Sequence, residues 1–411
     1  MANWRQSAPN WITYFNCELR VTNYELRVTN YELRVTNYEL RVMNCELLYT
    51  IALTRVLPYQ SQMQQILLDA AGSATALYEA RNSLRDILPD ASDRLIKTLA
   101  QMEEHVSRAE QEVAFAEKNR IQMLTRDNLL YPARLRECLD APILLFYRGS
   151  ADLNSRHILS IVGTRKATEY GKSFCQRFLS ELSQLCPDVL IISGLAYGID
   201  INAHRQALSH GLPTIGVLAH GLDQIYPRMH RQTAIDMLTH GGLLTEYTSQ
   251  TVPDKLNFVA RNRIVAGMAD ATLVVESAER GGSLITAGLA EDYGREVFAL
   301  PGRISDTASA GCNRLIRDNR AALLQSAEDF AEAMGWATNS TENQPIQREL
   351  FPELSPEEKV VYNSLKGTDG KQLNLLTVET NMPIGKLSSL LFDMEMRGIV
   401  RRLSGGIYRI I

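Results

Sequence analysis

The sequence lacks the short patterns that would place it in several common functional classes. Its six cysteines form no CxxC pair and stand at no Cys/His spacing suited to zinc, so we expect reduced thiols and no metal site. No GxGxxG fingerprint follows the first predicted strand, and no GxxxxGK(S/T) occurs in the chain. NAD binding and P-loop hydrolysis are therefore disfavoured, and no cofactor is predicted.

Long apolar runs are missing as well. The longest, such as Ala141 to Tyr147, fall far short of the roughly 20 residues that a membrane span requires. The segment from Met1 to Asn16 also has no continuous apolar stretch of the kind that a signal peptide needs. We therefore expect a cytoplasmic protein with no membrane contact.

Positive charge is not in excess over the whole chain. The 411 residues carry a formal net charge of -4, so any site for a polyanion must be a local cluster of cations. Hydrophobic residues make up 45% and charged residues 22%, which is typical of a soluble globular protein. The length predicts two or three compact domains.

The N-terminal segment is repetitive. From Asn16 to Thr50 the text Asn-Tyr-Glu-Leu-Arg-Val-Thr recurs five times at a spacing of seven, with small deviations. Apolar residues alternate with polar ones inside each repeat, so the apolar spacing of a coiled coil is absent. We favour a duplicated leader without a role over a short β-forming adhesive segment.

The periodicity of apolar residues divides the rest of the chain into a helical part, a central part of alternating strands and helices, and a mainly helical C-terminal part. Helical periodicity is expected over 62–71, 74–80 and 91–116. Near the C-terminus, Ser355-Pro-Glu-Glu begins a helix with a capping signature, and helices at 373–379 and 383–397 precede a hairpin at 400–411. Three helices and a hairpin are the winged-helix layout. The predicted segments are a leader at 1–46, a small helical domain at 47–124, an α/β domain at 125–335, a polar linker at 336–354 and a winged-helix domain at 355–411.

Six short β-rich segments alternate with helical ones in the central part. Strands separated by helices predict right-handed crossovers and a parallel sheet that is covered on both faces, the doubly wound α/β class. The predicted strands are Ile158 to Val162, Val189 to Ser193, Thr214 to Leu218, Leu243 to Glu246, Ala271 to Glu276 and Glu296 to Leu300.

Glycine-rich loops follow several of these strands. In an open parallel sheet, ligands lie beyond the carboxyl ends of the strands, where helix N-termini direct free N–H groups at anions. Glycine lets backbone amides approach an oxygen, and neighbouring hydroxyl groups can add donors. The alternative role of each glycine is simply to turn a tight corner. The candidate phosphate-binding residues are Gly163, Thr164, Ser193, Gly194, Gly281, Gly282, Ser283 and Thr286.

Cations gather near the same loops. Arg165 and Lys166 follow the first predicted strand, and Lys255, Arg261 and Arg263 lie in one short segment around Phe258. An aromatic ring among cations suits an unpaired nucleic-acid strand, because bases stack on the ring while Lys and Arg neutralise phosphates. Without those charges, Phe258 would be assigned to the core of an amphipathic helix.

Read in order, these motifs resemble the DNA-processing protein A family, also called DprA or Smf. The resemblance covers Ile158 to about Ala321. It rests on Gly163-Thr-Arg, Ser193-Gly-Leu-Ala-Tyr-Gly-Ile-Asp, Gly221-Leu-Asp with Ile225-Tyr-Pro, Arg261-Asn-Arg-Ile-Val-Ala-Gly, Gly282-Ser-Leu-Ile-Thr-Ala, Val297-Phe-Ala-Leu-Pro-Gly and Gly311-Cys-Asn-Arg-Leu-Ile.

The resemblance implies an extended Rossmann-like domain that dimerises, binds single-stranded DNA in a basic pocket without chemistry, and helps load the recombinase RecA during natural transformation. It also implies that Arg165, Lys255 and Phe258 contact DNA. Two roles stay open for Arg261 and Arg263, namely contact with DNA and internal ion pairs that fix the pocket. The helical domain lacks the family's helix-hairpin-helix motif, which argues against DNA contact by that domain. The third helix of the winged-helix domain carries few cations, so a structural or protein-contact role of this domain is at least as well supported as DNA binding.

The alternative function is enzymatic. Similar sheets serve nucleotide phosphoribohydrolases of the lysine-decarboxylase-like type, but Arg280-Gly-Gly-Ser-Leu-Ile-Thr-Ala-Gly lacks their glutamate after the threonine. Glu246 and Glu276 could act as acid or base, although helix capping or pairing with Arg261 and Arg263 is the simpler assignment. For His204, His220 and His230, polar packing is favoured over metal or acid-base roles.

Overall fold

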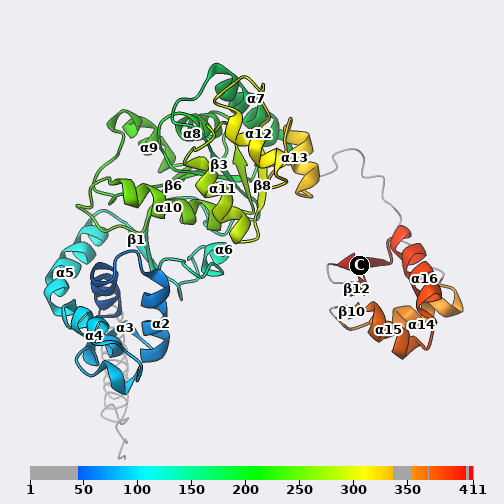
Figure 1. Ribbon diagram of the computed structural model, residues 1–411, viewed down its shortest axis with the longest axis horizontal. Coiled ribbons are helices and arrows are strands. Elements are labelled where there is room, and N and C mark those ends of the chain that lie inside the picture. Colours follow the sequence, from blue (N-terminus) through cyan, green and yellow to red (C-terminus); the bar gives the residue numbers. More distant parts are fainter. Residues whose placement is uncertain (1–44, 337–353, 369, 404–406, 411) are drawn as a thin grey trace, which may run out of the picture. The chain divides into compact units, whose positions relative to one another are not determined.

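The computed structural model describes residues 45–336, 354–368, 370–403 and 407–410. The chain splits into two compact units, residues 1–338 and 339–411, each with its own core (Figure 1). The leader expected at 1–46 lies outside the described residues except for Cys45 and Glu46. Both belong to a helix that covers residues 45–56.

The first unit begins with helices packed around a small apolar core. They are the helix at 45–56, α2 (Ser61–Ala71), α3 (Ala74–Glu79), the 3-10 turn η1 (Leu84–Asp86), α4 (Asp93–Ala100) and α5 (Met102–Lys118). Ser73 and Ser92 cap α3 and α4 by accepting hydrogen bonds from backbone N–H groups of the first turn. The single helix expected over 91–116 is broken at Gln101, which separates α4 from α5.

This helical part shares its core with the sheet. Ile143, Leu144 and Phe146, at the start of the second strand, are buried together with Ile51, Leu67 and other apolar side chains of the helices. The carboxylate of Glu112 on α5 accepts hydrogen bonds from the Ser249 backbone N–H (2.8 Å) and Oγ (2.6 Å) and from Arg108 (2.8 Å). Apolar burial and the hydrogen bonds of Glu112 and Arg108 to Ser249 therefore hold the helices against the sheet.

A nine-stranded mixed sheet forms the centre of the unit, in the order β1-β2-β6-β5-β4-β3-β7-β8-β9. The seven strands β6, β5, β4, β3, β7, β8 and β9 run parallel to one another. The strand β2 is antiparallel to both β1 and β6. The strands are β1 (Gln122–Thr125), β2 (Leu144–Gly149), β3 (Ile158–Val162), β4 (Leu190–Ser193), β5 (Thr214–Val217), β6 (Gly241–Thr245), β7 (Ala271–Val274), β8 (Glu296–Ala299) and β9 (Ala322–Leu323).

Helices cover both faces of this sheet, as the doubly wound prediction requires. Along β3, Ile158 and Val162 point into one core and Leu159 and Ile161 into the other, because successive strand residues face opposite sides. One face packs against α10 (Lys255–Gly267), α11 (Ser283–Asp292) and α12 (Ala310–Arg317). The other packs against α7 (Glu169–Leu185), α8 (Ile199–Ser209) and α13 (Ala327–Ala333). Shorter elements are α6 (Ala133–Arg136), η2 (Arg228–His230) and α9 (Arg231–Met237).

All six predicted strands are present; Ile158 to Val162 has the expected bounds, and the ends of the others differ by at most two residues. The sequence did not predict β1, β2 or β9 among the strands, although β2 overlaps the apolar run from Ala141 to Tyr147. Trp336, assigned to the linker, is buried against Phe330 and His157, so it belongs to the core of the first unit. The rest of the predicted linker, up to residue 353, lies outside the described residues.

The second unit is a winged helix, as predicted. Its helices are α14 (Pro356–Leu365), α15 (Leu373–Thr380) and α16 (Ile384–Met396), and Ser355 and Glu358 form the expected capping box. A small sheet has the order β10 (Lys371–Gln372), β12 (Ile407–Ile410), β11 (Val400–Leu403). Throughout the described part of both units, no helix is long and apolar enough to span a membrane.

Candidate functional site

A pocket of about 250 Å³ opens at the carboxyl ends of the parallel strands. It lies where the strand order reverses, since β3 stands between β4 on one side and β7 on the other. This switch point is the usual ligand position in an open α/β sheet. Among the predicted site residues, those that line the pocket are Gly163, Thr164, Arg165, Phe258, Arg261, Gly281, Gly282, Ser283 and Thr286.

The start of α11 forms one wall of the pocket. A Cβ added at Gly282 would meet no atom within 4 Å, so the backbone there faces open space. Ser283 is buried, and its Oγ has no hydrogen-bond partner among the described residues. A buried hydroxyl without a partner is costly unless a ligand satisfies it. This wall therefore offers a hydroxyl donor beside the positive end of a helix, which suits an anion.

A cation and two aromatic rings lie together at the pocket. The guanidinium carbon of Arg165 stands 5.1 Å from the ring centroid of Phe258, within cation–π distance, and the Arg165 side chain is exposed. The Phe258 ring is half-buried, and Tyr226 lies 5.9 Å from it, centroid to centroid. Tyr226 was not predicted as a site residue, although Ile225-Tyr-Pro was among the motifs of the resemblance. Lys255 is exposed in the first turn of the same helix as Phe258, but it does not line the pocket.

Arg261 lies at the pocket but is almost completely buried. Its Nη1 donates to the Val217 carbonyl at 2.5 Å, while its Nε has no partner within the described chain. Burial lowers the pKa of Arg261, and the nearby Asp200 carboxylate opposes that shift. Burial also disfavours the charged form of Asp200 and so raises the pKa of this carboxyl group. A Cβ at Gly194 would collide with the Arg261 guanidinium, so the glycine makes room for this side chain.

Arg263 points away from the pocket. It forms a buried ion pair with Glu246 and donates to Ser61 Oγ at 3.2 Å. Of the two roles left open by the sequence, the structure therefore places Arg263 in an internal ion pair. Arg261 combines an internal contact with a position at the pocket wall.

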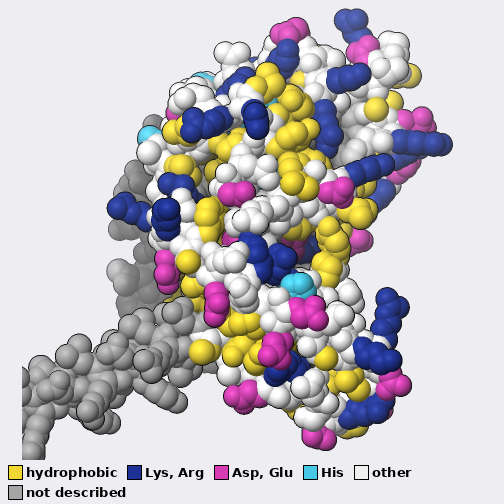
Figure 2. Space-filling view, turned by 90° about the vertical axis from the view of Figure 1, so that its left-hand side faces the viewer, with side chains coloured by type: hydrophobic (Ala, Val, Ile, Leu, Met, Phe, Trp, Pro, Cys, Tyr) yellow, Lys and Arg dark blue, Asp and Glu magenta, His cyan; other side chains and the backbone are white. Residues whose placement is uncertain are grey.

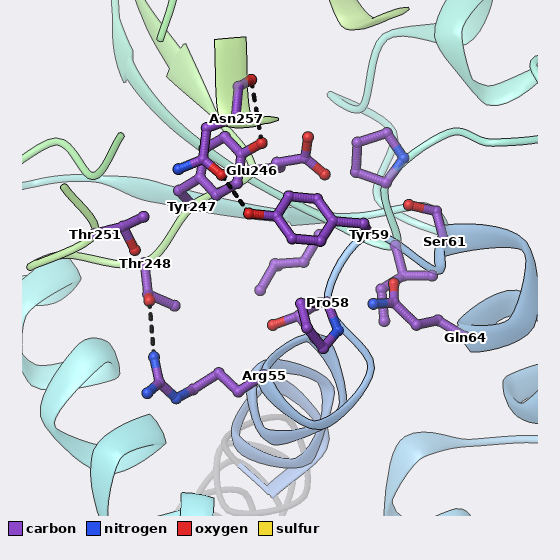
Figure 3. A pocket seen from close by; sticks show the side chains of 14 residues that line it. Arg55, Pro58, Tyr59, Ser61, Gln64, Glu246, Tyr247, Thr248, Thr251 and Asn257 are labelled. Carbon is purple, nitrogen blue, oxygen red and sulfur yellow. Dashed lines mark hydrogen bonds between the residues drawn. The ribbon is translucent and has the colours of Figure 1, made fainter. Parts of the chain in front are cut away.

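A second cavity, of about 210 Å³, separates the helices from the sheet near Glu246 (Figure 3). Tyr59 projects across it and donates to Asn257 at 2.5 Å, and Arg55 donates to Thr248 at 3.2 Å. The bridging contacts of Figure 3 thus join the helical part to the loop and helix that follow β6.

The remaining predicted residues lie beside the pocket rather than in it. Ser193 is fully buried, and its hydroxyl donates to the Ile161 carbonyl at 2.6 Å, which leaves it unavailable to a phosphate. Lys166 is exposed on the loop after β3 but does not line the cavity. Sequence reasoning placed Ser193 correctly at a strand end, but it could not show which way the hydroxyl points.

The acids and histidines considered for catalysis have structural partners. Glu276 accepts from the Thr168 backbone N–H (2.9 Å) and Oγ1 (2.5 Å) and so caps α7, and Glu246 pairs with Arg263. These are the capping and pairing assignments that the sequence favoured.

The three buried histidines are packed as expected. His204 contacts Thr214 Oγ1 at 2.7 Å, His220 contacts the Gly221 carbonyl at 2.9 Å, and His230 contacts the Leu195 carbonyl at 2.9 Å. No group of three potential metal ligands occurs among the described residues.

Family models and curated proteins of similar sequence point to the same family as the sequence motifs do. A family model described as DNA recombination-mediator protein A matches residues 122–335, and one described as DprA winged helix domain matches residues 348–406. Protein Smf of Escherichia coli is 33% identical over 312 residues, which is 73% of this chain and 80% of that protein. DNA processing protein DprA of Streptococcus pneumoniae is 40% identical over 199 residues, 48% of this chain and 69% of that protein.

A solved structure extends the likeness to three dimensions. The X-ray structure of DNA processing protein A from Streptococcus pneumoniae matches with a TM-score of 0.59 and 32% identity, covering 70% of this chain and 97% of that one. The sheet, the glycine-lined pocket and the winged helix thus occur together in a chain that belongs to the DNA-processing protein A family, also called DprA or Smf.

Proposed function

We propose that the pocket at the switch point binds single-stranded DNA without breaking any bond in it. The protein then acts as a mediator that helps load RecA onto the bound strand during natural transformation. The family description, DNA recombination-mediator protein A, and the relatives' names, DNA processing protein and Smf, are consistent with this role. The proposal includes a homodimer as the working form.

The observation that carries the proposal is Arg165 stacked on Phe258 at a pocket walled by glycine amides and a free hydroxyl. A phosphate can bind the guanidinium and the start of α11, while an unstacked base can pack against the aromatic ring. Bases of a duplex are already stacked and cannot reach the ring in this way. The site therefore favours a single strand over a duplex.

The phosphoribohydrolase alternative has little support from the acids. Glu276 is occupied in capping α7, and Glu246 faces the helical part, so neither lines the pocket. Asp200 is the carboxylate that lines the pocket within the described residues; it lies beside Arg261 and accepts weakly from the Ala196 backbone N–H at 3.4 Å. Release of free base from nucleoside monophosphates at catalytic rates would favour the enzymatic alternative.

The proposal is tested by the salt dependence of binding to a labelled single-stranded oligonucleotide and to its duplex. If each protomer neutralises about three to four phosphates, log K should fall with log salt at a slope near -2 to -3. Arg165→Ala should make this slope shallower by about 0.7 because one phosphate contact is lost.

Arg156→Ala is the matched control. Arg156 is also exposed, but it precedes β3 at the opposite, amino end of the strand, so this variant should bind like the unaltered protein. Equal slopes for the unaltered protein and Arg165→Ala, or equal affinity for duplex and single strand, would contradict the assignment.

The partner proposals have their own measurements. RecA filament formation on single-stranded DNA should speed up when the protein is added, and Arg165→Ala should lose most of that effect while Arg156→Ala keeps it. Sedimentation equilibrium should give the mass of two chains. A monomer, or an unchanged rate of filament formation, would contradict the respective part of the proposal.

A further inference from the structure

A separate groove of about 410 Å³ lies on the side of the sheet that α9 covers. Its bed is apolar and includes Leu222, Ile225 and Leu238. Three arginines line it: Arg148 on β2, Arg228 in η2 and Arg231 at the start of α9. Arg228 and Arg231 lie three residues apart, and Arg148 comes from a strand 80 residues earlier, so the fold brings Arg148 to a local pair of arginines.

The arginines of this groove are not neutralised within the protein. All three are exposed, and none has a hydrogen-bond or ion-pair partner among the residues that the structure describes. Asp223 is the acid that lines the groove, so three positive charges face one negative charge. Figure 2 shows that hydrophobic side chains are exposed on this unit among charged side chains of both signs, so an excess of positive charge is a property of the groove and not of the whole face. Such a surface fits a ligand that is both anionic and partly apolar, as a strand of phosphates and bases is.

One loop reaches from the groove to the pocket. Residues 222–228 supply part of the groove wall, and Tyr226 in the same loop lies 5.9 Å from Phe258, ring to ring. Tyr226 is 44% exposed as a residue. Aromatic and cationic groups therefore follow one another from Arg165 through Phe258 and Tyr226 to Arg228. From β3 to β2 there are four strand spacings, a span of about 19 Å, which requires a strand of several nucleotides.

We propose that this arginine groove is a second subsite, which binds the part of a single DNA strand that extends beyond the switch-point pocket. The inference rests on the proposed function of that pocket. The exposed Tyr226 ring, between groove residues and Phe258 of the pocket, offers a further surface for base stacking and so favours a nucleic-acid strand over an acidic peptide, which the same charges could also attract. The groove residues then contribute to binding only when the strand is long enough to reach them.

The test compares oligothymidylates of about 6 and about 20 nucleotides on the full chain, since single-strand sites commonly take roughly 4 to 16 nucleotides. The double variant Arg228→Gln, Arg231→Gln should bind the long strand about tenfold more weakly and leave the short strand unchanged. Its salt slope on the long strand should become shallower by about 1.4, the value for two lost phosphate contacts.

Arg148→Gln on β2 is an independent variant in the same groove and should give a smaller loss confined to the long strand. Arg156→Gln controls for the removal of an exposed arginine elsewhere, and an unchanged melting temperature shows that each variant is folded.

An unchanged affinity for the long strand, or an equal loss on both lengths, would overturn the second subsite. Failure of the short strand to bind at all, or to respond to Arg165→Ala, would instead contradict the proposed function of the pocket. If the long strand is unaffected but an acidic peptide loses affinity, the groove is a peptide site and the inference is wrong.

Discussion

Gly194 and Gly282 show two different physical reasons for a glycine at the same rim of the sheet. At Gly194 a Cβ would collide with the guanidinium of Arg261, which is held in place by the Val217 carbonyl. At Gly282 a Cβ would enter open space. Gly194→Ala should therefore lower the free energy of unfolding by about 1–3 kcal/mol through overpacking. Chemical denaturation measures this, and Gly282→Ala, within about 0.5 kcal/mol of the unaltered protein, is the control.

The buried His204 makes stability depend on pH. Burial lowers the pKa of His204 to about 3, whereas its value in the unfolded chain is about 6.5. Between these values the unfolded state binds one more proton than the folded state, so stability falls as the pH falls below about 6.5. The contribution is at most about 1.4 kcal/mol per pH unit. His204→Asn should remove it, and unfolding between pH 6 and 4.5 should then show a shallower pH dependence. Parallel pH profiles would contradict the assignment.

Phe258 is expected to contribute to DNA affinity without contributing charge. Phe258→Ala should weaken binding of a single strand by roughly 1–3 kcal/mol, since a stacking surface is lost, and should leave the salt slope nearly unchanged. Phe258→Tyr keeps the ring and should retain affinity. A change of slope as large as that of Arg165→Ala would show that the substitution had displaced the neighbouring guanidinium instead.

At this scale the sequence predicted which residues lie near the pocket better than it predicted what they do. Gly163 and Arg165 line the cavity because they directly follow β3, and strand ends can be found from periodicity. Phe258 and Ser283 line it from the beginnings of α10 and α11. The directions of the Ser193 hydroxyl and the Arg263 guanidinium depend on partners distant in sequence, the Ile161 carbonyl and Glu246, which no local pattern reveals.

Among the secondary-structure elements, α5 holds the helical part to the sheet through one buried acid. Glu112→Ala should destabilise the first unit by about 3 kcal/mol, because it removes the counter-charge of Arg108 and leaves the buried Ser249 N–H without its acceptor. Glu117→Ala on the same helix removes an exposed acid and should have little effect. Hydrogen exchange at α5 amides should speed up in the first variant and not in the second. Equal protection in both would contradict the role of Glu112.

The six predicted strands are the ones that alternate with helical segments, as the parallel part of a doubly wound sheet requires. The apolar run before Arg148 forms most of β2, which no such alternation indicates because β2 pairs antiparallel with β1 and β6. The strand β1 is short and partly exposed, and it exists because β2 pairs with it, a long-range contact that periodicity does not reveal. The break between α4 and α5 escaped prediction for a related reason, since helical spacing resumes directly after Gln101 and continues the pattern.

For the whole molecule, the two units should behave independently in stability and in binding to short DNA. The winged helix has its own core of Val361, Leu391, Met394 and Val400 with other apolar residues. A chain ending at residue 338 should therefore keep the melting temperature of the larger unit and its affinity for a 6-nucleotide strand. Calorimetry and binding titrations check this. A large drop in either would show that the winged helix supports the pocket directly.

The core that the helical part shares with β2 also limits where two related proteins can be joined to make a chimaera. Ile143, Leu144 and Phe146 belong to the interior of the helical part, although they follow it in the chain by some twenty-five residues beyond the end of α5 at Lys118. A chimaera joined just after Lys118 would set helices from one parent against a β2 from the other, and neither surface would match. The exchangeable block therefore extends at least through Gly149. Because Glu112 also binds Ser249, a graft that carries Ser249 together with the helices should express and fold where one joined at Lys118 fails.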